Sequence, residues 1–338
     1  MPFKGRLLVA HFGHKPKSDL IRYASMVARL RQPQLAEEPD WPLLPDSPAV
    51  GRSAVRVAQS RHSHAHSPAT AIDSDTEVRF LSLLPMAADE AEHQGRSARA
   101  MLRAKVNKFF ACPSERLAVA CDVLRGQTVR RLLGFATDFG SDLILVGDDG
   151  CPRKKVARLA MEAPYPVWIV PSGWAPVLRR ILAPIDLSER STECLQAAIH
   201  LARRFPRAKC VALHIDRHDT RASGDTITPA RRRELLGKFE TLMHGIDSAG
   251  VPVVPLFVKG HHVNRAIERQ ANHNPPDLIV MATRGRSRLA GKLLRSETEA
   301  ALQGCRGAML VLKSADRPLG VRAALCERLE TTEDPHFS

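Results

Sequence analysis

The chain has 338 residues, 44% of them hydrophobic, and its formal net charge at pH 7 is +14. This length and apolar content predict two globular domains of ordinary size, each with a core of its own. The positive charge favours acidic partners. Nucleic acid is nevertheless disfavoured, because the basic residues form no long block and only 5% of the residues are aromatic, too few for a base-stacking surface.

Cysteine usage and hydropathy exclude further classes. The 7 cysteines include no CxxC pair, which predicts reduced thiols in a cytoplasmic protein rather than a disulfide framework or a zinc site. No apolar run approaches the roughly 20 residues that span a bilayer, so we expect no membrane partner. The apolar run at Leu7–Ala10 ends at His11 and is too short for a signal sequence.

The first elements in chain order are a short buried strand at Arg6–Phe12 and a helix at Asp19–Leu30. A stretch at about 31–76 follows, rich in Pro, Ser, Ala and His, which predicts a flexible insertion. His62, His64 and His66 alternate within it. A transition metal could bind such a trio, but no acidic or Cys residue completes a site nearby, so we predict no metal.

The rest of the first half predicts further strands and helices. Leu124–Leu133 is typical of a strand end, a Gly turn and a helix start, and Asp142–Val146 is an apolar run without alternation. Such a run indicates a strand buried on both faces of a parallel sheet. A basic helix from Arg153 to Arg158 is predicted to be a solvated face, and Pro166–Val170 is predicted as a last strand.

The second half repeats this order. Arg180–Asp186 parallels the first strand, and the helix predicted at Thr192–Arg204 carries an apolar stripe of Leu195, Ala198, Ile199 and Ala202. Three later segments then match their counterparts: Val258–Ile267, Asp277–Met281 and Ala308–Leu312.

The repeat predicts the fold class: α/β, with two tandem Rossmann-like α/β/α domains, each with a five-stranded parallel sheet. We place a degenerate domain at 1–175, a better-matching domain at 176–315 and a C-terminal tail at 316–338. Pairing of Val167–Val170 with Met309–Leu312 would place Trp168 at the interface and make an internal pseudo-dimer.

Ligands of open parallel sheets bind at the carboxyl ends of strands. In the second half those ends carry Asp186, His214 with Ile215, Lys259 with Gly260, and the segment 282–287. Ala183–Glu189, Leu213–Ile215, Val258–Gly260 and Asp277–Ser287 together resemble the universal stress protein domain. The resemblance covers about 178–314 well and the first half weakly.

The resemblance implies an ATP site in those family members that carry Gly, two residues, Gly, nine residues, Gly and then Ser or Thr after the fourth strand. Glycines let backbone N–H groups approach phosphates at a helix start, and an Asp after the first strand contacts the adenosine. Asp186 matches that Asp. Ala282 replaces the first Gly, Gly285 matches the second, and Arg295 replaces the third ahead of Ser296.

Two interpretations of this departure stay open. In one, the second half resembles the branch that lacks the glycine pattern and binds no ATP. In the other, Arg284, Arg286, Arg288 and Arg295 replace backbone contacts by guanidinium contacts to an anion. The candidate nucleotide-binding set is Asp186, Ile215, Lys259, Gly260, Ala282, Arg284, Gly285, Arg295 and Ser296.

The first half departs further from the pattern. Phe12 stands where Asp186 stands in the second half. Gly147 and Gly150 match two glycines, but Asp148 and Asp149 between them would repel phosphate, so we predict turn residues rather than a nucleotide site there.

The sequence shows no complete catalytic constellation: neither a nucleophile elbow, zinc-ligand spacing nor a phosphate loop of the GxxxxGK[ST] type. We therefore predict a non-catalytic, cytoplasmic regulatory protein of the stress-response type that binds protein partners and forms an internal pseudo-dimer or a homodimer. The alternatives are an ATP or other adenine-nucleotide sensor, with weak ATP hydrolysis left open, and a nucleic-acid-associated basic protein.

Overall fold

The computed structural model describes residues 5–13, 16–30, 76–85, 91–110, 117–126, 128–188, 191–217, 226–248, 250–283 and 291–313. The predicted insertion, with its three histidines, and the predicted C-terminal tail lie outside these residues, except that Thr76 is already the first residue of a strand. None of the described helices is long and apolar enough to cross a membrane.

Strands and helices alternate along the first half. Its elements are β1 Gly5–Phe12, α1 Ser18–Leu30, β2 Thr76–Leu84, α2 Ala91–Phe109, β3 Leu117–Arg125, α3 Val129–Phe139, β4 Leu143–Gly147, α4 Arg153–Glu162 and β5 Val167–Val170. The second half repeats the order with β6 Arg180–Ile185, α5 Ser191–Ala202, β7 Lys209–Asp216, α6 Pro229–His244, β8 Val253–Lys259, α7 Val263–His273, β9 Leu278–Thr283, α8 Gly291–Gly304 and β10 Met309–Lys313.

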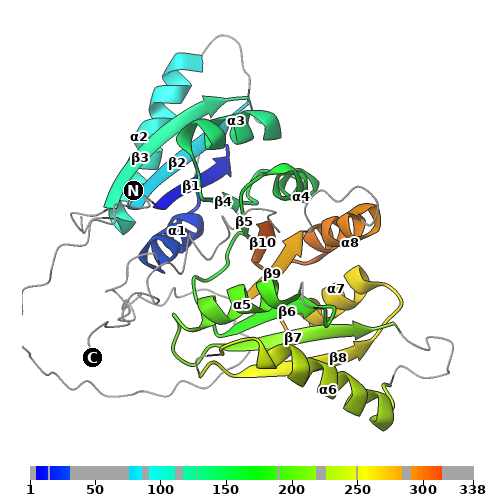
Figure 1. Ribbon diagram of the computed structural model, residues 1–338. Coiled ribbons are helices and arrows are strands. Elements are labelled where there is room, and N and C mark those ends of the chain that lie inside the picture. The colour runs from blue at the N-terminus through cyan, green and yellow to red at the C-terminus, as the bar shows by residue number, and fades with distance from the viewer. Residues whose placement is uncertain are drawn as a thin grey trace, which may run out of the picture.

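The strands form one continuous sheet with the order β3-β2-β1-β4-β5-β10-β9-β6-β7-β8. Within each half the five strands are parallel, as predicted. The halves join where β5 pairs antiparallel with β10, with Trp168 opposite Leu310. Figure 1 shows β5 and β10 between the two sets of strands. The predicted pairing of the two last strands is therefore confirmed.

Helices cover both faces of this sheet. Buried residues of α1, α2, α5 and α6 form one apolar cluster with one face of the strands. Residues of α3, α4, α7 and α8 form the other. The stripe of Leu195, Ala198, Ile199 and Ala202 predicted on α5 is buried in the first cluster. Each half is thus a three-layer α/β/α unit, which confirms the predicted fold class.

An Arg-Asp contact recurs at the same place in each half. In the first half, Asp142 Oδ2 accepts the Arg6 N–H at 2.7 Å. In the second, Asp277 Oδ2 accepts the N–H groups of Arg179 and Arg180 at 2.7 and 2.8 Å. In both halves the Asp N–H returns a hydrogen bond to the Arg carbonyl. These bonds fix the first strand of each half beside the start of the fourth.

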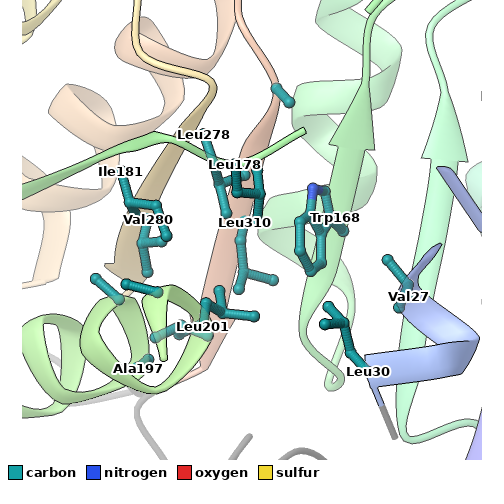
Figure 2. Close-up of a cluster of buried hydrophobic side chains, with 14 of the residues drawn as sticks. Val27, Leu30, Trp168, Leu178, Ile181, Ala197, Leu201, Leu278, Val280 and Leu310 are labelled. Carbon is teal, nitrogen blue, oxygen red and sulfur yellow. The ribbon is translucent and has the colours of Figure 1, made fainter. Parts of the chain in front are cut away.

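The apolar core runs through the seam between the halves. Trp168 is fully buried, and its ring meets that of Tyr23 edge-on, with the centroids 5.5 Å apart. Figure 2 shows the indole between Leu30 of α1 and Leu310 of β10, with Leu178 and Leu278 beyond. Side chains of both halves therefore share one core cluster.

Candidate functional site

The fourth and first strands of the second half separate before they end. The pairing of β6 with β9 stops at Leu182 and Ile279, whereas β6 continues to Ile185 and β9 to Thr283. The strand order reverses between these two strands, with β7 and β8 on one side and β10 on the other. This switch point is where open parallel sheets bind ligands.

Asp186 follows β6 at this edge and is exposed. Its Oδ1 accepts hydrogen bonds from the Ser188 N–H at 3.1 Å, from the Ser188 hydroxyl at 2.5 Å and from the Ser191 hydroxyl. Ser191 Oγ in turn accepts the Asp186 N–H at 2.9 Å. Asp186 thus shapes the turn into α5, and its carboxylate is held at the edge of the sheet.

Leu187 within that turn has a left-handed backbone, with φ at 61°. A bulky residue rarely adopts this conformation, which costs free energy that the surrounding contacts must offset. Here the Asp186 hydrogen bonds to Ser188 and Ser191 hold the turn, and the Leu187 side chain packs against the core. The strained turn keeps Asp186 at the switch point.

Ile215 and Gly260 lie together at the ends of β7 and β8. A Cβ added to Gly260 would stand 3.3 Å from Ile215 Cγ2 and 3.3 Å from Ala266 Cβ. The Gly260 N–H donates to the Asp216 carbonyl at 3.1 Å. Glycine therefore lets the start of α7 approach β7 closely. Lys259 is half-buried beside them, and its carbonyl accepts from Arg269 at 3.4 Å.

The remaining predicted site residues are described only in part. Ala282 is half-buried in β9, opposite Leu312 of β10. Arg295 and Ser296 belong to α8. Arg284 and Gly285 lie outside the described residues, as do Arg286 and Arg288. The proximity of Ile215 to Gly260 is thus observed, whereas the role of the segment between β9 and α8 stays a prediction.

Sequence reasoning missed a buried ion pair at the same edge. Asp216 is 4% exposed, and its two carboxylate oxygens receive Arg231 Nη2 at 3.0 Å and Nε at 3.1 Å. Arg231 also donates to Glu234 at 2.7 Å. The pair ties the first turn of α6 to the end of β7. Nothing in the run of Arg231, Arg232 and Arg233 singles out the first of them from sequence alone.

His214 lies two residues before Asp216, on the same face of β7. Its Nδ1 is 3.2 Å from the Ile185 carbonyl, and its ring meets Phe257 edge-on at 6.3 Å. Burial lowers the pKa of His214 below its usual value, so the ring is neutral at physiological pH. A neutral ring with Nδ1–H donated to the carbonyl leaves Nε2 as an acceptor.

The corresponding edge of the first half is filled by side chains. Phe12, at the position of Asp186, is buried, and Lys155 Nζ lies 4.6 Å from the centre of its ring. A Cβ on Gly147 would stand 3.1 Å from Leu20, and one on Gly150 would stand 3.0 Å from the Phe12 carbonyl oxygen. Gly150 has φ at 67°, which suits a turn residue, as predicted. Gly147, also predicted as a turn residue, is instead the last residue of β4.

One expectation for this half was wrong. Arg153, predicted to lie on a solvated helix face, is half-buried and reaches across the seam. Its Nε donates to the Leu302 carbonyl at 3.0 Å, and its Nη2 to that of Gly307 at 3.5 Å. The sequence showed a basic helix start, but α4 packs against α8 and thereby brings this guanidinium to backbone carbonyls of the second half.

Catalytic or metal-binding groupings are sparse in the described ranges. No cluster of three or more His, Cys, Asp or Glu side chains there is arranged to hold a metal ion. The buried thiols of Cys194, Cys210 and Cys305 have pKa values raised to about 12 by burial, which keeps them protonated and unreactive at neutral pH.

Comparison with known proteins gives a family match for the second half and a fold for both halves. The model described as the universal stress protein family matches residues 178–313. No curated protein matches the chain. The solved structure of a universal stress protein from Archaeoglobus fulgidus DSM 4304 has a TM-score of 0.53 at 12% identity, covering 91% of this chain and 97% of that chain. A functionally unknown protein from Pseudomonas aeruginosa PAO1 has a TM-score of 0.54 at 14% identity, covering 91% of this chain and 92% of that chain. At these identities the likeness concerns the fold, and it extends over both halves.

Proposed function

We propose that the chain, whose residues 178–313 match the universal stress protein family model, is a non-catalytic stress-response regulator that acts by binding protein partners or a ligand. The main support comes from the hydrogen bonds of three polar side chains at the carboxyl ends of the second-half strands. Asp186 holds a turn, Asp216 holds Arg231, and His214 faces a backbone carbonyl. In these contacts each of the three side chains holds part of the framework.

The organisation that goes with this proposal has a degenerate domain at 1–175, a second domain at 176–315 and a tail at 316–338. The first domain supports the second through the shared sheet and offers an outer surface to partners. We further propose a cytoplasmic location. An internal pairing through β5 and β10 supports a pseudo-dimer within one chain, and a homodimer would use other surfaces.

The alternative function is that of an adenine-nucleotide sensor using the second domain. Two observations favour it. Asp186 stands exposed at the switch point, and β6 and β9 separate beside it. Two substitutions argue against a nucleotide site: Ala282 and Arg295 each replace a glycine of the family pattern. A Cβ or a long side chain takes space where backbone N–H groups would meet phosphate.

Calorimetry with ATP distinguishes the two proposals. We expect no ATP binding at micromolar affinity that depends on Asp186. The wild-type protein is titrated beside Asp186→Ala and beside Asp138→Ala, which removes an exposed carboxylate from α3. Heat that Asp186→Ala abolishes and Asp138→Ala retains would instead establish the nucleotide sensor. Absence of heat in all three directs the search to protein partners.

Phosphate release tests the claim that the chain is not an enzyme. With excess ATP and Mg²⁺, we expect the wild-type protein and Asp186→Ala to release phosphate at the same background rate. The reason is that the Asp186 carboxylate already accepts hydrogen bonds from the Ser188 and Ser191 hydroxyls, which makes it a weaker general base. A wild-type rate well above that of Asp186→Ala would contradict the non-catalytic proposal.

The nucleic-acid alternative is supported only by the net charge.

A further inference from the structure

The linker between the two halves begins with a tight turn. After β5 the chain turns at Pro171–Trp174, where the Trp174 N–H donates to the Pro171 carbonyl at 3.2 Å. Gly173 has φ at 78°, the left-handed conformation that the third residue of a type II turn requires. Ser172 and Gly173 are themselves exposed, so apolar burial does not hold them in place.

Three charged side chains of the first half hold this turn. Asp148 Oδ1 accepts the Ser172 N–H at 3.0 Å, and Asp19 Oδ2 accepts the Gly173 N–H at 3.1 Å. Lys17 donates to the Ser172 hydroxyl and forms an ion pair with Asp149 at 2.7 Å. Hydrogen bonds to ionised groups are about twice as strong as neutral ones. The turn thus lies against the carboxyl ends of the first-half strands.

The roles in this contact are the reverse of those in a phosphate site: the first-half edge supplies negatively charged acceptors, and the linker supplies N–H donors. Where Gly147 and Gly150 match the glycines of a phosphate loop, the chain presents the carboxylates of Asp148 and Asp149. Carboxylates cannot hold an anion, but they accept backbone N–H groups well. The two N–H donors come from the linker itself.

The same linker and the same carboxylate also reach the second half. Trp174 Nε1 donates to the Asp277 carbonyl at 2.8 Å, and Leu178 is buried in the shared core. Asp148 Oδ2 lies 3.5 Å from Arg153 Nη1, and Arg153 donates to the Leu302 carbonyl of α8. Two routes therefore lead from the Asp148 carboxylate into the second half, through the linker and through Arg153.

We propose that the carboxyl edge of the degenerate half is an intramolecular receptor for the linker, and that Asp19, Asp148 and Lys17 fasten Ser172–Gly173 there as a strap. The strap limits rotation of one half against the other about the β5–β10 pairing, which involves three residue pairs. This inference concerns the first half and the linker, so it holds whether or not the second half binds a nucleotide.

Hydrogen exchange resolved at single amides tests the strap in the full chain. In Asp148→Ala we expect the Ser172 amide to exchange about tenfold faster. In Asp19→Ala we expect the same increase at the Gly173 amide. In each case the amide loses a charged acceptor. In the double variant Asp19→Ala/Asp148→Ala, we expect the β5 and β10 amides that cross the seam also to exchange several-fold faster. Asp138→Ala removes an exposed carboxylate of the same half and should leave both regions unchanged.

Unchanged exchange at Ser172 and Gly173 in the single variants would overturn the proposal. Faster linker exchange with an unchanged seam in the double variant would also overturn it, because the linker would then be bound without restraining the halves. If the aspartate variants fail to fold, Lys17→Met decides. The Lys17 side chain is 52% exposed, so the change spares the core, and it should still speed exchange at Ser172.

Discussion

Replacement of Trp168 by alanine is expected to lower the free energy of unfolding by about 3–5 kcal/mol, the usual cost of removing a large buried aromatic side chain. The indole is fully buried and contacts Tyr23 of the first half. Its strand also pairs with β10 of the second half. The cavity would therefore open inside an apolar cluster that both halves share, and both should unfold at a lower urea concentration.

Urea unfolding followed by far-ultraviolet circular dichroism measures this effect, since the signal does not depend on the tryptophan that is removed. Trp168→Phe is the matched variant: it keeps an aromatic ring against Tyr23 and should lose clearly less stability than alanine. Val177→Ala, at a linker position that is 39% exposed, should change little. A Trp168→Ala protein within about 1 kcal/mol of wild type would contradict the idea that the seam is a true core.

Acid is expected to destabilise the protein through His11. This residue is the last but one of β1 and is 3% exposed, and its Nε2 meets the Ser82 hydroxyl of β2. Burial is the main cause that lowers the pKa of His11 from 6.5 to about 4, with Lys105 lowering it further and Asp149 opposing them. Between these two pH values the unfolded chain binds a proton that the folded chain does not. Stability therefore falls as the pH falls from 6.5 to 4, and His11 adds no further change below that.

The contribution of His11 amounts to about 2 kcal/mol at pH 5, with each pKa unit worth about 1.4 kcal/mol. It is isolated by comparing wild type with His11→Gln, which retains a polar group for Ser82. The loss of stability between pH 7 and pH 5, measured by urea unfolding, should be smaller in His11→Gln by about that amount. His273→Gln, an exposed histidine at the end of α7, should keep the wild-type loss. Equal losses in wild type and His11→Gln would show that His11 charges freely in the fold.

Much of the candidate site could be predicted from the sequence, because the ends of the strands could be predicted. The apolar runs before Asp186, at Leu213–Ile215 and before Gly260 mark buried parallel strands, and parallel strands bring their carboxyl ends to one edge. Ile215 and Gly260 do meet there. The ion pair of Asp216 with Arg231 could not be predicted from the sequence, because it lies in a run of three arginines. Only the rotation of α6 about its axis decides which of the three faces β7.

By itself the sequence determined the repeat and the alternation of strands and helices in both halves, because each depends on local runs of apolar residues that must be buried. Tertiary structure decided where the charges act. In the sequence Asp148 is only a carboxylate that would repel phosphate, and Arg153 is only the start of a basic helix. In the structure Asp148 accepts the Ser172 N–H of the linker, and Arg153 donates to the Leu302 carbonyl across the seam. Their roles depend on distances between groups far apart in the chain, and such distances exist only once the two halves have joined into a single sheet.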